Sequence, residues 1–146
     1  MVVKTLIKES FKPKDTFDIG KELGREAKLG DCVCLIGDLG TGKTLFAQGF
    51  ASGIGIKEDV NSPTFTILQE YDDGRVPFYH FDVYRIEAIE EMEDIGFMEY
   101  VDGDGVCLIE WADKILELLP LHYTKIILEK DLEKGFYYRK VTIETK

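Results

Sequence analysis

The sequence has few cysteines and histidines and no long apolar run. Cys32, Cys34 and Cys107 form no CxxC pair, and with only His80 and His122 available a four-ligand zinc site is not expected. An odd number of thiols, two of them inside an apolar run, is typical of buried cysteines in a reducing compartment. No run approaches the roughly 18 apolar residues that a membrane helix requires. We therefore expect a cytoplasmic protein without a membrane segment.

Basic side chains are also scarce. Lysine and arginine number 18 against 28 acidic residues, which gives a formal net charge of -10. Non-specific affinity for nucleic acid comes from basic side chains that neutralise phosphates, so a protein that grips nucleic acid through a broad surface of its own is disfavoured. The acidic charge favours either a solvated surface or contact with a basic partner.

The chain of 146 residues, 45% of them hydrophobic, predicts one domain over residues 1–146. Short apolar runs alternate with helical patterns, as in an α/β fold with a mostly parallel central sheet covered by helices. Two later segments, with turns near Gly74 and Gly135, predict antiparallel hairpins added to this sheet, and Gly74 is available for a positive φ in the first turn. Strands are expected at residues 3–8, 32–37 and 105–111, hairpins at 64–86 and 125–145, and helices from Asp15 or Thr16 to Gly30 and at 43–54, 87–95 and 113–120.

The early helix, which starts near Asp15, contains Gly20 and Gly24. Glycine lowers the intrinsic stability of a helix, by about 1 kcal/mol per residue relative to alanine. We therefore expect this helix to pack closely against another element at these two positions.

The segment GDLGTGKT, residues 37–44, matches the P-loop pattern GxxxxGK[ST] between a predicted strand and a predicted helix. Glycines allow the backbone to approach phosphates closely, and the helix that follows adds the positive end of its dipole. Lys43 is expected to reach the β- and γ-phosphates, and the Thr44 hydroxyl to hold Mg²⁺. The residues predicted to hold the phosphates are Asp38, Leu39, Gly40, Thr41, Gly42, Lys43 and Thr44.

Two acids follow apolar runs at predicted strand ends, Asp82 after FYHF and Glu110 after VCLI. Ligands bind beside the carboxyl ends of the strands in sheets of this kind. One acid is expected to coordinate Mg²⁺ and the other to position an attacking water. The alternative for each acid, a helix cap or an ion-pair partner, stays open on this pattern.

The segment NSPTF lies between the P-loop pattern and the two acids. Pro63 favours extended backbone at Ser62, and the Thr64 hydroxyl is placed to sense a γ-phosphate, as switch segments do. The pattern by itself favours a simpler role, in which these hydroxyls support the entry of a loop into a strand.

The motifs GDLGTGKT, SPTF, HFDVYR and IEW, in this order and spacing, resemble the bacterial TsaE (YjeE) family over about residues 16–111. The resemblance implies a compact ATPase that binds ATP with Mg²⁺ and acts with the paired proteins TsaD and TsaB. In that family TsaD places threonylcarbamoyl on adenosine 37 of tRNAs that read codons beginning with A. The ATPase is linked to resetting the complex and meets tRNA only indirectly, which suits an acidic chain.

The resemblance also assigns roles to residues of this sequence. It implies that Lys43, Glu110 and Thr64 act in catalysis, with Thr64 as the switch hydroxyl. Thr44 and Asp82 are implied on the metal side, and Glu110 is a candidate for either metal contact or water positioning. Thr16 falls in the segment that corresponds to the adenine side. Trp111, the only tryptophan, is expected near the nucleotide, near a partner, or in the core.

Three rival functions can be compared with the sequence, and only the last of them stays fully open. A small-molecule kinase usually brings several arginines to its acceptor, whereas a GTPase needs an N-K-x-D segment, which is absent here. A nucleotide-dependent switch with negligible turnover shares the same loop. Because only Arg85 lies near the motifs in sequence, we expect weak ATP hydrolysis alone and dependence on the complex. The arginines are Arg25, Arg75, Arg85 and Arg139.

Overall fold

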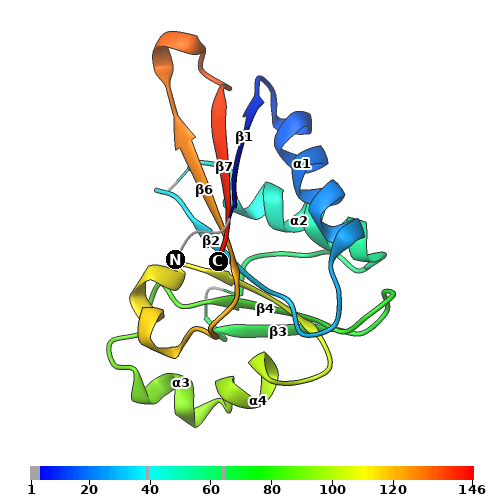
Figure 1. Cartoon of the computed structure of the whole chain (residues 1–146), viewed down its shortest axis with the longest axis vertical. Coiled ribbons are helices and arrows are strands. Elements are labelled where there is room, and N and C mark those ends of the chain that lie inside the picture. The colour runs from blue at the N-terminus through cyan, green and yellow to red at the C-terminus, as the bar shows by residue number, and fades with distance from the viewer. Residues whose placement is uncertain (1–3, 39, 64) are drawn as a thin grey trace.

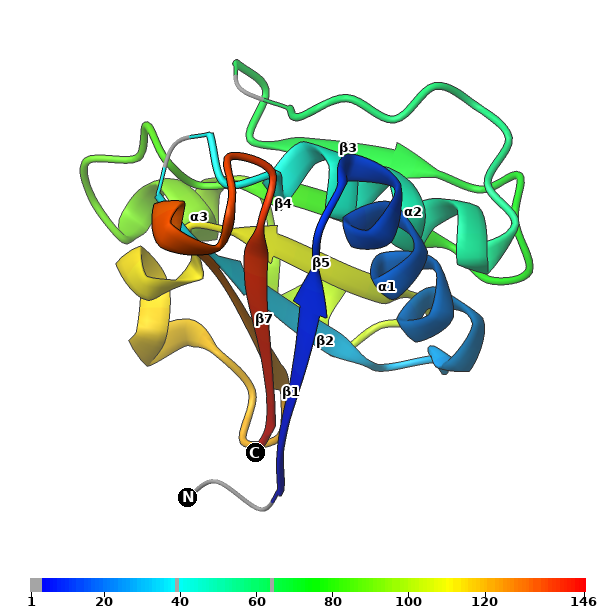
Figure 2. The same cartoon turned by 90° about the horizontal axis from the view of Figure 1, so that it is seen from above.

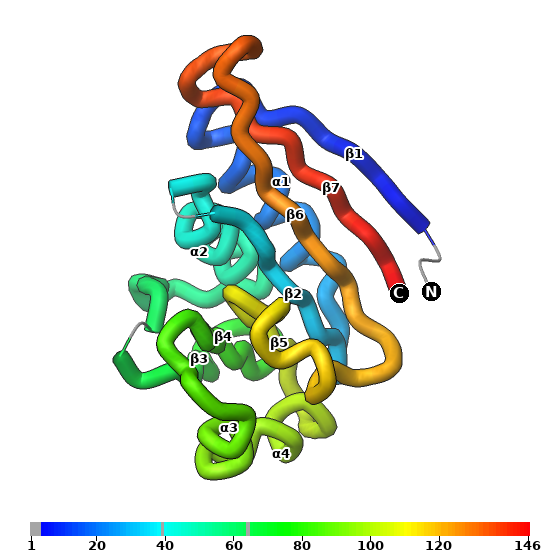
Figure 3. Tube along the Cα trace, turned by 90° about the vertical axis from the view of Figure 1, so that its left-hand side faces the viewer, coloured from blue at the N-terminus to red at the C-terminus, as the bar shows by residue number. Residues whose placement is uncertain are grey.

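The computed structural model describes residues 4–38, 40–63 and 65–146, and these form a seven-stranded sheet in the order β1-β7-β6-β2-β5-β4-β3. The neighbours β6, β2, β5 and β4 are parallel, while β1–β7, β7–β6 and β4–β3 are antiparallel. Figure 3 follows this order from β1 to β5 across the sheet. The strands are β1 Lys4–Ser10, β2 Cys32–Ile36, β3 Leu68–Tyr71, β4 Phe78–Asp82, β5 Val106–Glu110, β6 Thr124–Lys130 and β7 Arg139–Thr145.

Helices cover both faces of this sheet (Figure 1). The helices α1 (Pro13–Glu26) and α2 (Lys43–Ile54) bury one core, and α3 (Glu90–Asp94), α4 (Phe97–Val101) and the 3₁₀ segment η1 (Ala112–Leu118) bury the other. A short 3₁₀ turn, η2 (Leu132–Lys134), stands at the tip of the β6–β7 hairpin. Among the described helices, none is long and apolar enough to cross a membrane.

The predicted fold class is confirmed: a parallel centre with hairpins at its edges. Strands β2 and β5 are almost wholly buried because both of their faces meet helices, which is why their sequences are continuous apolar runs. The parallel register brings the carboxyl ends of β2, β4 and β5 to one edge of the sheet, where the loop before α2 also begins.

The glycines of α1 allow it to pack closely against α2, as expected (Figure 2). A Cβ on Gly20 would lie 2.4 Å from the Phe46 carbonyl oxygen. The contact is reciprocal, because a Cβ on Gly49 of α2 would lie 2.0 Å from the Phe17 carbonyl oxygen. At these glycine positions only backbone fits between the two helices, so the pair holds the start of α2 in a defined place.

The predicted start of α1 at Asp15 or Thr16 is wrong, because the helix begins at Pro13 with Lys12 as its N-cap. Proline is well suited to the first turn of a helix, where its missing N–H costs nothing. The Asp15 carboxylate instead accepts a hydrogen bond from the Phe11 N–H at 3.0 Å.

The end of α1 also differs from the expected stop at Gly30. The helix ends at Glu26, and the Arg75 guanidinium donates to the carbonyls of Gly24 and Ala27, each at 2.9 Å. A side chain 50 residues further along thus satisfies the last carbonyls of the helix. Gly30 still has a φ of 90° in the turn that leads to β2.

Three local predictions need correction. Gly74 does not have a positive φ; its small size matters because a Cβ there would lie 2.7 Å from Ile56 Cδ1. The helix expected over 87–95 is reduced to α3, and a second short helix, α4, follows Gly96. The helix expected at 113–120 is the 3₁₀ segment η1, interrupted by non-helical backbone at Ile115.

Candidate functional site

The glycine-rich loop joins β2 to α2, as its pattern predicts. Gly42 is the N-cap of α2 with a φ of 98°, and Gly40 has a φ of 78°, conformations that favour glycine. The helix begins without a side-chain cap and without an acid in its first turn. Its first N–H groups and positive dipole end are therefore available to an anion.

Lys43, the first residue of α2, turns its ammonium group back into this loop. Its Nζ donates to the carbonyl oxygens of Gly37 and Asp38, the latter at 3.0 Å. The same atom lies 4.2 Å from the centroid of the Trp111 ring. Burial lowers the pKa of Lys43, with Glu110 as the main opposing influence. A bound anion would compensate this cation more fully than the loop carbonyls do.

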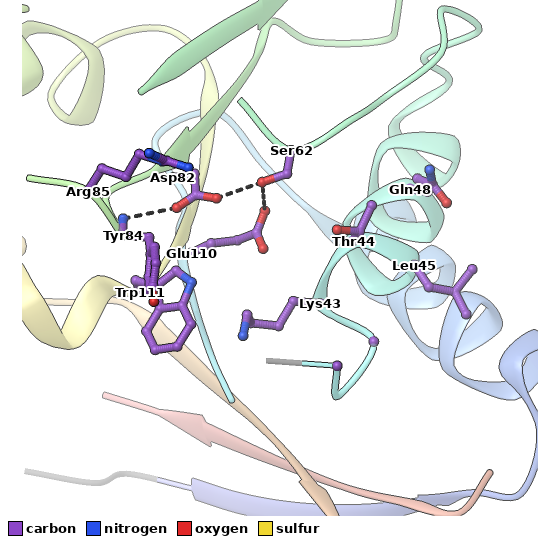
Figure 4. Close-up of a pocket in the computed structure, with 12 residues that line it drawn as sticks. Lys43, Thr44, Leu45, Gln48, Ser62, Asp82, Tyr84, Arg85, Glu110 and Trp111 are labelled. Atoms are coloured by element: carbon purple, nitrogen blue, oxygen red, sulfur yellow. Dashed lines mark hydrogen bonds between the residues drawn. The ribbon is translucent and has the colours of Figure 1, made fainter. Parts of the chain in front are cut away.

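Two acids face the loop from the ends of β4 and β5. Asp82 and Glu110 are direct neighbours in the parallel register, and their exposed fractions are 7% and 2%. The Ser62 hydroxyl donates to Asp82 Oδ2 at 2.6 Å and reaches Glu110 Oε2 at 3.4 Å (Figure 4). Asp82 Oδ1 also accepts from the Tyr84 N–H at 3.0 Å.

The loop and the acids line one cleft of about 700 Å³. Figure 4 shows Lys43 and Thr44 on one side of this cleft and the carboxylates of Asp82 and Glu110 on the other. The lining residues are Gly40, Gly42, Lys43, Thr44, Leu45, Gln48, Ser62, Asp82, Tyr84, Arg85, Glu110 and Trp111.

Not every predicted site residue lines this cleft. Asp38 and Thr41 belong to the glycine-rich loop but face a neighbouring hollow beside β6. Thr16 is buried beside the loop, with its hydroxyl 2.7 Å from Ser10 Oγ and its methyl 3.7 Å from the position of a Cβ on Gly42. Leu39 and Thr64 lie outside the described residues.

Two contributors to the acid cluster have no site role in the sequence-based prediction. Ser62 bridges the carboxylates, and His80 lies beneath them with Nε2 2.7 Å from Glu110 Oε2. The clue to His80 was strand periodicity, because His80 and Asp82 are two residues apart and so share a face of β4. Ser62 comes from a loop and has no periodic signal, so its only clue was its place in the SPTF motif.

The prediction that only Arg85 lies near the motifs is incomplete. Arg85 does line the cleft. Arg139, at the start of β7, also reaches the glycine-rich loop, where it donates to Thr41 O at 3.0 Å and to Gly40 O at 3.3 Å. Its guanidinium holds the loop from outside, since it is not part of the cleft lining. The pairing of β6 with β7 places Arg139 at the end of the hairpin that lies beside the glycine-rich loop.

The oxygen atoms in the cleft suit a hard divalent cation. Within the described residues, no group of three or more His, Cys, Asp or Glu side chains is arranged as a metal cage. Mg²⁺ is usually held by one or two carboxylates together with substrate phosphates and water, rather than by such a cage. Asp82, Glu110 and the exposed hydroxyl residue Thr44 therefore fit Mg²⁺ better than zinc.

The sequence matches one family model and is similar to the sequences of known proteins. A family model described as "Threonylcarbamoyl adenosine biosynthesis protein TsaE" matches residues 10–141. The "tRNA threonylcarbamoyladenosine biosynthesis protein TsaE" of Bacillus subtilis (strain 168) is 50% identical over 128 residues, which cover 88% of this chain and 80% of that protein. The protein of the same name from Treponema pallidum (strain Nichols) is 44% identical over 130 residues, 89% and 93% of the two chains.

A solved structure agrees with the sequence relatives. The crystal structure of Bacillus subtilis YdiB superposes with a TM-score of 0.84 at 42% sequence identity, and covers 99% of this chain and 87% of that one. The family model and the relatives each span most of the sequence, including the glycine-rich loop and both acids. The chain therefore belongs to the TsaE family.

Proposed function

We propose that the protein is a P-loop ATPase that binds Mg-ATP and supports threonylcarbamoylation of adenosine 37 in tRNAs that read codons beginning with A. The names of its relatives support the tRNA threonylcarbamoyladenosine pathway. One observation carries the ATPase part: an uncapped helix start with a buried lysine faces two strand-end carboxylates across a single cleft.

Each wall of the cleft has a separate task in this proposal. The backbone N–H groups of residues 38–44 and the Lys43 ammonium hold the phosphates. When the phosphates bind, Lys43 donates to phosphate oxygens instead of to the loop carbonyls. Mg²⁺ held by Thr44 and Asp82 would neutralise charge on the phosphoryl oxygens. Glu110 positions the attacking water. Thr64 as the switch hydroxyl and Thr16 on the adenine side complete the proposed assignment.

The proposal includes two partners, the proteins TsaD and TsaB, with tRNA handled by that pair. An acidic chain is suited to a basic protein surface rather than to tRNA itself. We expect slow hydrolysis by the chain alone and faster hydrolysis in the complex. Arg139 is occupied with the loop carbonyls, and the guanidinium of the exposed Arg85 lies over the Phe65 ring, 4.9 Å from its centroid. We therefore expect a partner to place Arg85 or to supply the group that completes the transition state.

The test is ATP hydrolysis by the purified chain, alone and then with TsaD and TsaB from the same source, with GTP in parallel. Stimulation by the pair that is selective for ATP is the expected result. Equal rates with and without the pair would contradict the partner assignment. Turnover that requires a small phosphate acceptor would instead favour a kinase.

A further inference from the structure

His80 is a buried polar side chain with a single described polar contact. Its exposed fraction is 0%, and its Nε2 lies 2.7 Å from Glu110 Oε2. Its other ring nitrogen, Nδ1, is the one buried side-chain nitrogen or oxygen among the described residues that lacks a hydrogen-bond partner. Such exceptions are rare in proteins and call for a physical reason.

The surroundings of the His80 ring are otherwise apolar. The ring stacks on Phe78, with centroids 5.9 Å apart and an interplanar angle of 21°. Its neighbour across the β4–β5 register is the fully buried Leu108. A phenylalanine would suit this setting without leaving a polar atom unpaired. The packing therefore does not explain the imidazole, whereas the contact with Glu110 does.

The hydrogen bonds also assign the tautomer. A carboxylate only accepts hydrogen bonds, so the contact is made by an Nε2–H that donates to Glu110 Oε2. Nδ1 then carries a lone pair. A proton on Nδ1 would be a buried donor without a described acceptor, which costs more than an unpaired acceptor. The ring is thus directed at Glu110 through its Nε2–H.

This contact restricts the Glu110 carboxylate. The two described polar contacts of the Glu110 carboxylate, with His80 Nε2 at 2.7 Å and with Ser62 Oγ at 3.4 Å, are both made by Oε2. The single Ser62 hydroxyl proton goes to the nearer Asp82 Oδ2, so the His80 Nε2–H is the donor that holds Glu110. None of the described bonds involves Oε1, and Glu110 lines the cleft. A carboxylate whose Oε2 accepts a hydrogen bond from a fully buried ring presents its second oxygen in a fixed orientation. Partners of this kind typically change activity about 10- to 100-fold when they are removed.

We propose that His80 is a positioning residue for hydrolysis, which orients Glu110 through its Nε2–H from beneath the cleft. The inference rests on the proposed ATPase function and adds to it a residue that does not touch the nucleotide. His80 keeps the Glu110 carboxylate oriented towards the attacking water and does not itself transfer a proton.

The test compares His80→Phe with His80→Gln. Phenylalanine keeps the ring and removes the donor, whereas the glutamine side-chain N–H₂ can replace Nε2–H. We expect His80→Phe to lower kcat about 10- to 100-fold and to leave the affinity for a non-hydrolysable Mg-ATP analogue within about twofold. His80→Gln should recover most of kcat. The control is His122→Gln, at the exposed histidine, with unchanged kcat.

A second measurement does not depend on turnover. The ¹⁵N resonances of the nucleotide-free protein, assigned with the His122→Gln variant, should show His80 protonated at Nε2 and not at Nδ1. The Glu110→Ala variant should shift the Nε2 resonance. An Nε2 that carries no proton, or an Nε2 resonance that does not change when Glu110 is removed, would overturn the proposal even if His80→Phe does not fold.

The outcomes separate the inference from the function on which it rests. A wild-type chain that neither binds nor hydrolyses ATP, alone or with TsaD and TsaB, would overturn the proposed function and the hydrolytic role of His80 with it. An active wild type with an equally active His80→Phe would overturn the role of His80 alone. Equal losses of kcat and analogue affinity would also contradict it, because they indicate general damage to the cleft.

Discussion

The two walls of the cleft are built in opposite ways. The loop wall comes from one contiguous stretch of sequence, of which Gly40, Gly42, Lys43 and Thr44 line the cleft, and offers mainly backbone N–H groups together with one lysine. The acid wall collects Ser62, His80, Asp82 and Glu110 from three separate segments, and its side chains bond to one another. The loop wall is suited to binding phosphates and the acid wall to chemistry, so changes in the two walls should separate binding from turnover.

Glu110→Ala should produce the largest effect, a loss of turnover with nucleotide binding retained. General-base and water-positioning groups typically contribute about 10²–10⁴-fold to rate, so we expect a loss in this range. The measurement is ATP hydrolysis in the presence of TsaD and TsaB, beside binding of a non-hydrolysable analogue. Glu117→Ala, at an exposed glutamate outside the cleft, is the control. Normal hydrolysis by Glu110→Ala would remove Glu110 from the mechanism.

Lys43→Ala should instead weaken binding. Hydrogen bonds to charged groups contribute about 1.5–3 kcal/mol each, which corresponds to an affinity for Mg-ATP about 10- to 100-fold lower. Calorimetric titration measures it, and Lys57→Ala, at an exposed lysine distant in sequence from the loop, is the control. If the affinity is unchanged while turnover falls, the assignment of phosphate binding to the loop wall and of chemistry to the acid wall is wrong.

Ser62→Ala should affect the folding stability of the nucleotide-free protein. Its hydroxyl lies between two nearly buried carboxylates, and its loss leaves them without this donor. We expect the free energy of unfolding in urea to fall by about 1–2 kcal/mol. Ser52→Ala, at a half-buried serine on α2, should show no such loss. An unchanged urea midpoint would show that water replaces the hydroxyl.

Arg139→Lys should have the smallest effect, on the loop wall. A lysine keeps the charge but cannot bond to Gly40 and Thr41 in the geometry of the guanidinium. A loss equivalent to one hydrogen bond, about 0.5–1.5 kcal/mol, corresponds to nucleotide affinity about 2- to 10-fold lower. Arg25→Lys, at an exposed position on α1, is the matched control in the same titration. Equal affinities would mean that the loop keeps its shape without Arg139.

Much of the fold could be predicted from local sequence. The strands β2 and β5 and the helix α2 follow from apolar runs and from the glycine-rich loop, and α2 has the predicted bounds. The start of α1 follows from the local Pro13, but other wrong predictions fall where distant residues contact the backbone, as where Arg75 caps the end of α1. In η1, Ile115 is buried and leaves the helical conformation, so its packing there outweighs the helical period of the sequence.

The sequence by itself determined the loop wall and identified the two acids as candidates. The phosphate-binding residues of the loop are consecutive in sequence, and each acid directly follows an apolar run. Only the tertiary structure decided how close the acids lie and what holds them. Register between β4 and β5 pairs Asp82 with Glu110, and strand packing places His80 beneath them. Ser62 and Arg139 join the site through a loop and a hairpin whose positions depend on contacts across the whole sheet. Such contacts carry no local pattern, since they form only when distant segments fold together.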